Sequence, residues 1–178
     1  MSGERANTSA TATPRNFSVK LCSTPEERQR CMTIRNIVFC QEQGYDPAIE
    51  VDEKDPLSDH FLLTETKEDG TLEDVGTLRC YASPPDLLKL GRFAVHSRYR
   101  GTGAGRFLEE EFVKHLANRK PAPRCQEITE GKTQVEVVAF SQCIAVGFYT
   151  RLGWKTQGEE FLEEGQPHIK IVKTIKLD

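Results

Sequence analysis

The sequence has no long hydrophobic run and no excess of positive charge. No window of the 178 residues approaches the roughly 18 consecutive apolar residues that a membrane-spanning helix needs. Lysine and arginine number 24 against 27 aspartate and glutamate, which gives a formal net charge of −3. Proteins that bind a nucleic-acid backbone usually carry a basic surplus. These absences argue against a membrane protein and against nucleic acid as a general partner.

The six cysteines form no recognisable metal or disulfide pattern. None stands in a CxxC pair, and the spacing of Cys22, Cys31 and Cys40 fits no zinc module. The first residues lack the apolar stretch of a secretory signal peptide. We therefore expect reduced, mostly buried thiols in a cytoplasmic or nuclear protein, and no bound metal.

Length and composition indicate one folded domain behind an unstructured tail. A chain of 178 residues with 37% hydrophobic and 29% charged residues can bury one core and solvate its surface. Residues 1–15 are mostly small or polar, so they cannot bury enough surface to offset their chain entropy. We expect this tail to be disordered and the domain to cover residues 16–178.

Hydrophobic periodicity predicts an alternating series of strands and helices. Thr24, Pro25 and Glu27 together form the signature of a capped helix start. Breaks are expected at Pro84–Pro85 and from Pro121. The expected strands are 17–22, 60–66, 75–81, 88–95, 134–140, 154–157 and 167–176, and the expected helices are 24–39, 104–120 and 141–152.

The most informative segment joins the strand at 88–95 to the long helix through Arg100-Gly101-Thr102-Gly103-Ala104-Gly105. Glycines let the backbone approach a ligand closely. The first turn of a helix offers unpaired amide groups and the positive end of the helix dipole. With Arg98 and Arg106 nearby, this turn is suited to the pyrophosphate of a cofactor.

Two common phosphate-binding motifs do not fit this turn. A P-loop requires Lys followed by Ser or Thr after its glycines, and this pair is missing here. A dinucleotide fingerprint has the spacing GxGxxG in a strand-helix-strand unit, whereas this turn reads GxGxG and follows antiparallel strands. A nicotinamide-dependent oxidoreductase is therefore a distant alternative.

The turn instead resembles the acyl-CoA motif of the GNAT acetyltransferase superfamily, written R/Q-x-x-G-x-G/A. Arg100, Gly103 and Gly105 stand at its fixed positions. The segment AVGFYTRLGW at 145–154 is similar to the family's second signature, A-x-x-F-Y-x-x-x-G-F. The resemblance covers nearly the whole chain from Phe17.

A narrower resemblance is to the ElaA/YjcF-like branch of small GNAT enzymes. It rests on VFCQEQG at 38–44, on the acidic stretch that ends in Asp55 and His60, and on FLEEGQPHIK at 161–170. This branch gives little information about the acceptor substrate.

The resemblance implies an α/β (α+β) fold, in which a mixed, mainly antiparallel sheet of six or seven strands is flanked by helices. The central strands at 88–95 and 133–140 should run parallel and splay apart, with the cofactor's thioester in the gap. Acetyl-CoA is the implied cosubstrate, without a metal. GNAT enzymes often form dimers, so a homodimer is among the assemblies that the resemblance allows.

The resemblance also implies a cofactor site. The backbone of the strand at 88–95 should pair with the pantetheine arm, and the glycine turn should hold the pyrophosphate. Ser141 replaces a cofactor-binding Asn of many relatives, and at the start of a helix it can cap that helix and still reach the ligand. The implied cofactor-binding residues are Phe93, Ala94, Val95, Arg100, Gly101, Thr102, Gly103, Ala104, Gly105, Arg106, Ser141 and Phe148.

Tyr149 is the implied general acid, because a tyrosine at this position protonates the departing CoA thiolate in many GNAT enzymes. An ordinary phenol, with a pKa of about 10, stays protonated at neutral pH. The attacking amine must lose a proton, so a base or a water relay is needed. Glu42 is the first candidate for the base, with Glu136 and His168 as the others. Arg92 and His168 are expected to line the acceptor pocket.

These residues predict an N-acetyltransferase that moves an acetyl group from acetyl-CoA to a primary amine by direct attack in a ternary complex. No base stands beside Cys143 in sequence, which argues against an acetyl-cysteine intermediate. The expected acceptor is a small-molecule amine. Two alternatives stay open: a protein N-terminus or lysine as acceptor, and a non-catalytic acyl-CoA-binding regulatory domain. The acidic residues from Glu42 to Asp59 either attract a cationic amine or form a solvated surface, and we favour the second interpretation.

Overall fold

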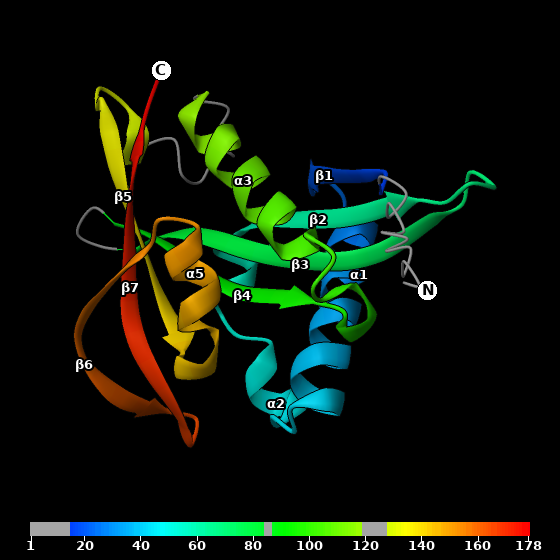
Figure 1. The fold of residues 1–178 in the computed structure, drawn as a ribbon, viewed down its shortest axis with the longest axis horizontal. Coiled ribbons are helices and arrows are strands. Elements are labelled where there is room, and N and C mark those ends of the chain that lie inside the picture. The colour runs from blue at the N-terminus through cyan, green and yellow to red at the C-terminus, as the bar shows by residue number, and fades with distance from the viewer. Residues whose placement is uncertain (1–14, 84–86, 119–127) are drawn as a thin grey trace, which may run out of the picture.

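The centre of the fold is one seven-stranded sheet in the order β1-β2-β3-β4-β5-β7-β6 (Figure 1). The computed structural model describes residues 15–83, 87–118 and 128–178. Neighbouring strands are antiparallel except for β4 and β5, so the expected mixed, mainly antiparallel sheet is confirmed. The strands are β1 (Phe17–Leu21), β2 (Asp59–Thr66), β3 (Leu72–Ser83), β4 (Leu87–Val95), β5 (Gln134–Gln142), β6 (Lys155–Glu163) and β7 (Gln166–Lys176).

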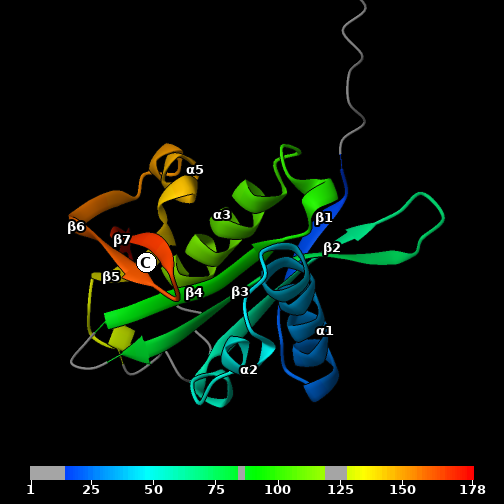
Figure 2. The ribbon, with the colours of Figure 1, turned by 90° about the horizontal axis from the view of Figure 1, so that it is seen from below.

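Helices cover both faces of the sheet (Figures 1 and 2). On one face lie α1 (Pro25–Arg35), a π-helix (Asn36–Glu42) that continues it, and α2 (Pro47–Glu50). On the other face lie α3 (Ala104–Ala117) and α5 (Val146–Arg151). None of the helices in the described ranges is long and apolar enough to cross a membrane. The predicted tail, up to residue 14, and the breaks expected at 84–85 and from 121 lie outside the described residues.

The packing of α3 holds the sheet from one side. Ala104, Leu108, Phe112 and Leu116 are buried, and their spacing of four residues puts them on one face of the helix. They join a core that includes Leu88 and other residues of β2 to β5 and β7. Each large apolar side chain buried in this way contributes about 1.5–3 kcal/mol. On the opposite face a smaller core lies under α1 and includes Cys31, Ile34, Val38, Leu62 and Ala94. The strand β4 is therefore fixed from both faces.

The start of α1 is as predicted, but its end is not. Glu27 N donates to Thr24 Oγ1 at 3.2 Å, and Thr24 N donates to the Glu27 carboxylate at 3.3 Å, which completes the capping box. Beyond Arg35 the helix widens into the π-helix, where Gln43 N donates to Val38 O five residues back. A π-helix of this kind is rare and is frequently found at functional sites.

Two elements near the C-terminus differ from the prediction. The helix expected at 141–152 is present as α5 but begins later, because Ser141 and Gln142 still pair with Ile169 and His168 of β7 and so belong to β5. The Ser141 hydroxyl donates to the Gln142 carbonyl oxygen at 3.0 Å and caps no helix. The strand β6 is longer than predicted, since its pairing with β7 resumes after an irregularity between Gln157 and Phe161.

The acidic stretch is folded around buried arginines. Arg35, fully buried on α1, donates to Glu50 and, at 2.6 Å, to Asp55. Arg79 on β3 donates to Asp52 at 2.6 Å and to Asp55 at 2.7 Å. The favoured interpretation of a solvated acidic surface is therefore wrong for Glu50 and Asp55, which are both buried. Their charges are neutralised by partners that lie far away in the sequence.

The pKa of Asp55 reflects its ion pairs with the two buried arginines. Burial alone would raise the pKa of Asp55, but hydrogen bonds and charge from Arg35 and then from Arg79 hold it well below its usual range. A carboxylate whose pKa is lower in the folded chain stabilises the protein above its unfolded pKa of about 3.9. This contribution is lost as the pH falls through the folded pKa.

We expect Asp55→Asn to lower the free energy of unfolding at pH 7 by about 3–5 kcal/mol, because two buried arginines lose a counter-charge. Urea unfolding followed by circular dichroism measures this. The control Glu53→Gln, at a side chain that is 81% exposed, should change stability by less than about 0.5 kcal/mol. Between about pH 5 and pH 2 the Asn variant should lose less stability than the wild type. Equal losses would show that Asp55 is not held ionised by the fold.

Candidate active site

The site begins where β4 and β5 part. The two strands pair only at Leu88 with Val137 and at Lys89 with Val138, so the pair is parallel and then splays, as predicted. Beyond Lys89 the edge of β4 that faces β5 has no strand partner along the described residues. Arg92 interrupts the pairing of β4 with β3 and has a φ of +49°. Such strained backbone at a non-glycine residue is concentrated at functional sites.

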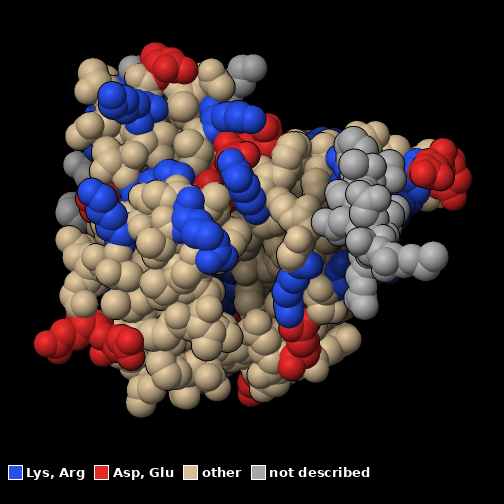
Figure 3. All heavy atoms as spheres, in the orientation of Figure 1, with Lys and Arg blue, Asp and Glu red and all other residues tan. Residues whose placement is uncertain are grey.

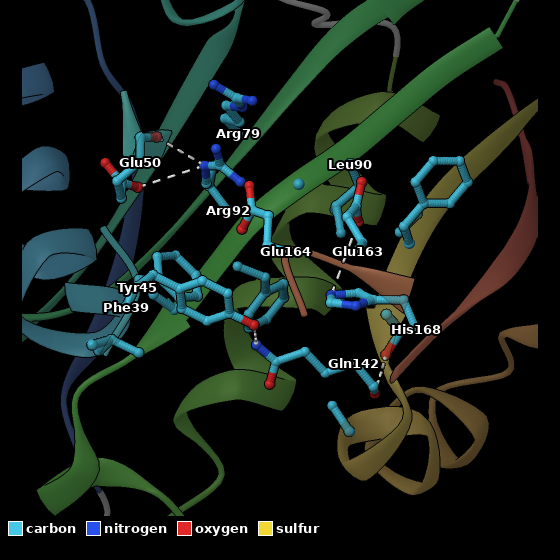
Figure 4. A pocket seen from close by; sticks show the side chains of 18 of the residues that line it. Phe39, Tyr45, Glu50, Arg79, Leu90, Arg92, Gln142, Glu163, Glu164 and His168 are labelled. Carbon is cyan, nitrogen blue, oxygen red and sulfur yellow. Dashed lines mark hydrogen bonds and ion pairs between the residues drawn. The ribbon is translucent and has the colours of Figure 1, made fainter. Parts of the chain in front are cut away.

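A cavity of about 500 Å³ opens at this parting (Figure 4). Its wall includes β4, the end of β5, the turn between β6 and β7, and the segment from the π-helix to α2. Eight of the residues that the sequence singled out line it together: Arg92, Phe93, Ala94, Val95, Arg100, Ser141, Tyr149 and His168. The lining does not include Glu42, Glu136, Phe148, Arg106 or the glycine turn at 101–105.

The glycine turn lies just beyond the cavity, at the start of α3. Gly103 is the N-cap of α3 with a φ of +89°, and no side chain caps the first amide groups. A Cβ on Gly105 would lie 3.2 Å from the ring of Phe148, so any larger residue here would have to displace that ring by a few tenths of an ångström. Figure 3 shows a hollow between α5 and the turn that leads into α3, with Lys and Arg side chains on its rim. An anion fits such surroundings.

Arg100 connects this turn to the π-helix. Its guanidinium forms an ion pair with Glu42 and also donates to the Val95 carbonyl oxygen at 3.2 Å. The carboxylate of Glu42 is therefore directed at Arg100, on the outer side of the site. Arg106 points elsewhere and pairs with Glu110 one turn along α3.

Tyr149 is held rigidly by aromatic rings. Its ring centroid lies 5.9 Å from that of Phe93, 5.0 Å from Phe148 and 5.6 Å from Trp154, all in edge-on contact. Only 7% of the residue is exposed. Burial, and then the negative charge of Glu109, raise the pKa of the phenol well above its ordinary value. The hydroxyl therefore stays protonated at neutral pH and can donate a proton.

His168 lies across the cavity on β7. Its Nδ1 is 2.9 Å from the carbonyl oxygen of Gln166, which can only accept, so Nδ1 carries the proton in the neutral ring. Nε2 is then the basic nitrogen, and it lies 3.9 Å from the Glu163 carboxylate. The ring stacks on Phe161 at 6.2 Å between centroids. This arrangement leaves one imidazole nitrogen able to accept a proton.

A polar bridge that the sequence did not indicate crosses the site. Gln142, at the end of β5, donates to Gln43 Oε1 at 3.0 Å and to the Tyr45 hydroxyl at 3.1 Å (Figure 4). Gln142 is almost a hundred positions away from both partners in the sequence, so no local pattern could reveal these contacts. Lys89, which also lines the cavity, was missed as well, although the strand that carries it was predicted.

Arg92 faces the cavity but is tied to the acidic segment. Its guanidinium donates to the carbonyl oxygens of Ile49 and Glu50 at 3.0 Å each. It therefore anchors α2 to the irregular part of β4. In the part of the chain that the structure describes, no group of three or more His, Cys, Asp or Glu residues is arranged to hold a metal ion.

Comparison with known proteins assigns the family. Residues 58–175 match the model of the acetyltransferase (GNAT) domain, so the chain belongs to the GNAT acetyltransferase family. The curated protein YyaT of Bacillus subtilis is 29% identical over 162 residues, which cover 89% of this chain and 97% of YyaT.

Solved structures share the fold. ElaA of Escherichia coli and an acyl-CoA N-acyltransferase of Pseudomonas aeruginosa each align with a TM-score of 0.66 and 22% identity, over 90% of this chain and 99% of theirs. The curated protein YjcF of Bacillus subtilis is 24% identical over 154 residues, which cover 86% of this chain and 96% of YjcF, so the chain is similar to both proteins for which the narrower branch is named.

We expect Gly103→Ala to lower the free energy of unfolding by about 1–2 kcal/mol, because alanine is strained in the left-handed conformation. The matched control is Gly147→Ala in α5, where the new methyl group has ordinary contacts and alanine favours the helix. This control should be neutral or stabilising. Urea unfolding of both variants tests the pair, and an equal effect of the two substitutions would contradict the expectation.

Proposed function

We propose that this protein transfers an acetyl group from acetyl-CoA to the primary amine of a small molecule, by direct attack within a ternary complex. The observation that carries the proposal is the cavity at the parting of β4 and β5. It has the free edge of Phe93–Val95 on one wall and places Tyr149 and His168 around the same space. Family membership supports acyl transfer from a CoA thioester, and one structural relative is described as an acyl-CoA N-acyltransferase.

The donor would enter along β4 toward the start of α3. The free backbone groups of Phe93–Val95 would pair with the pantetheine arm as a further strand does. The uncapped amides of the glycine turn and the guanidinium of Arg100 would hold the pyrophosphate. Arg100 would then exchange its pairing with Glu42 for the more highly charged ligand.

The acceptor would approach from the side of His168. An alkyl ammonium must lose a proton before it can attack, and the basic Nε2 of His168 is suited to take it. Glu163, 3.9 Å from Nε2, would stabilise the imidazolium that forms. We therefore propose His168 as the base in preference to Glu42, whose carboxylate is directed at Arg100.

The neutral amine then attacks the thioester carbonyl carbon and forms a tetrahedral intermediate. A backbone amide of Phe93–Val95 would stabilise the negative charge on its oxygen. Collapse of the intermediate breaks the carbon–sulfur bond, and the departing thiolate takes the proton of Tyr149. The products are the N-acetylated amine and CoA. The nitrogen, which still carries one extra proton after the attack, loses it through water to the Tyr149 phenolate, whose raised pKa favours reprotonation, and the His168 imidazolium releases its proton to solvent.

Two features favour a small-molecule acceptor over a protein acceptor, and direct attack over an acetyl-cysteine intermediate. The Gln142–Tyr45 bridge and the β6–β7 turn enclose the cavity, which suits a small acceptor better than a protein segment. Partial burial, and then the charge of Glu160, raise the pKa of the Cys143 thiol, and Cys143 does not line the cavity. A reactive thiolate for an acetyl-cysteine route is thus disfavoured.

The first experiment incubates the protein with acetyl-CoA and a panel of polyamines, amino sugars, arylalkylamines, amino acids and short peptides. Mass spectrometry then detects products that are heavier by an acetyl group, without thiol reagents. A change in melting temperature on addition of acetyl-CoA reports donor binding separately. Donor binding without acetylation of any panel member would favour the non-catalytic alternative, and acetylation of peptides alone would favour the protein acceptor.

Once the panel has identified an acceptor, the variant Tyr149→Phe can be tested with it. We expect kcat to fall by about tenfold or more, while the KM for acetyl-CoA stays within about twofold. His168→Gln should lower kcat similarly and flatten the rise of kcat/KM with pH. Tyr99→Phe is the control, since Tyr99 is an equally buried tyrosine that donates to Glu65 and Glu73 away from the cavity. An unchanged kcat in both Tyr149→Phe and His168→Gln would contradict these roles.

A further inference from the structure

The carboxylates by which the acidic segment approaches the cavity are already paired. Three of them are matched by three arginines, and each of these arginines has two of the three within 4.0 Å. The carboxylates are Glu50, Asp52 and Asp55, and the arginines are Arg35, Arg79 and Arg92. A cationic acceptor therefore gains little attraction from this segment, despite its composition.

Lys89 is the cation in the cavity lining that has no carboxylate within ion-pair distance. Among the described residues, the other positively charged or imidazole side chains of the lining each have a carboxylate within 4.0 Å. Lys89 has none, and its Nζ instead lies 3.7 Å from the ring centroid of Phe140. A cation over an aromatic ring is attracted to it, but the three N–H donors of the ammonium find no acceptor there.

The surroundings of Lys89 do not compensate for its lost hydration. Partial burial lowers the pKa of this ammonium, and the negative charge of Glu163 offsets only part of the effect. Glu163 itself is directed at His168 and is 44% exposed. An anion that entered the cavity would complete the interactions of Lys89.

The position of Lys89 relative to the proposed reaction centre sets the shape of such a ligand. Phe93 is four residues beyond Lys89 on β4, a distance of about 13 Å along a regular strand. Between them lies Gly91, and a Cβ built there would have only Arg79 Nε at 4.0 Å, so the floor is open. Leu90, Tyr81 and Phe140 also line the cavity and provide apolar surface beside the guanidinium of Arg79.

We infer that the acceptor is an elongated amine whose far end carries a carboxylate, with the carboxylate bound by Lys89 and the apolar body lying over Gly91. This inference rests on the proposed function, because it takes the amine to be placed beside Phe93–Val95. Allowing for the length of the lysine side chain, the nitrogen and the carboxylate would be about 6–10 Å apart.

Three six-carbon amines distinguish a preference for a distal carboxylate from a general affinity for amines. They are 6-aminohexanoate, hexylamine and 1,6-diaminohexane, whose far ends are anionic, neutral and cationic. We expect kcat/KM with acetyl-CoA to be about tenfold or more higher for 6-aminohexanoate than for hexylamine, and lowest for the diamine. Equal kcat/KM for all three would overturn the inference and leave the proposed function intact.

Substitutions of Lys89 test whether this side chain is the cause. Lys89→Met should remove the preference, lowering kcat/KM for 6-aminohexanoate about tenfold and leaving hexylamine within about threefold. Lys89→Glu should reverse it in favour of the diamine, and Lys89→Arg should retain it. Lys155→Met, at an exposed lysine of β6, is the matched control and should change nothing. A preference that survives Lys89→Met would overturn the assignment.

Equilibrium binding keeps the inference testable even without turnover. Titration calorimetry of the same three probes, with CoA present, measures their affinities directly. Tighter binding of 6-aminohexanoate than of the diamine, lost in Lys89→Met, would support the anion site. Absence of any charge preference would refute it. Failure of the proposed function would instead appear as an absence of acetyl-CoA binding or of acetylated product.

Discussion

The structure depends on the separation of two parallel strands. After two residue pairs, β4 and β5 can no longer bond, and the backbone groups of β4 up to Val95 face an opening. Backbone N–H and C=O groups away from water need partners, so a free strand edge beside a cavity is a site for a ligand with amide groups of its own. The irregular backbone at Arg92, the π-helix and the glycine turn all lie around this opening. Each of them departs from regular secondary structure where the site requires it.

The buried charge cluster fixes the second half of the site. Arg35 and Arg79 come from a helix and a strand, and the carboxylates that they pair with come from a segment without regular periodicity. Such a segment has little apolar surface to hold it, so paired charges replace hydrophobic packing. Arg92 extends the cluster into the cavity, and the wall of the site is thereby connected to the core.

Local sequence patterns predicted most of the fold, and the family resemblance pointed to eight of the residues that line the cavity. The strands β2 to β5, the helix α3 and the Thr24 capping box depend on neighbours within a few residues, and these were predicted correctly. The conformation of Ser141 was not, because its pairing with Ile169 outweighs the signal for a helix start. The burial of Glu50 and the bridge from Gln142 to Tyr45 depend on partners far away in the sequence. The sequence did not single out Lys89, because a lysine on a strand is usually solvated. Only the fold shows that it lines a cavity and forms no ion pair there.

The irregularity in β6 has a consequence for how the protein behaves at high concentration. β6 is the outer strand of the sheet, and an outer strand offers unpaired backbone groups that can recruit a strand from another molecule. Its pairing with β7 is interrupted near Gly158, and Glu159 and Glu160 follow directly in the interrupted stretch. At the opposite border β1 is only five residues long. One border is thus bent and negatively charged and the other is short, so neither provides the long, flat template on which fibrils or strand-exchanged aggregates grow.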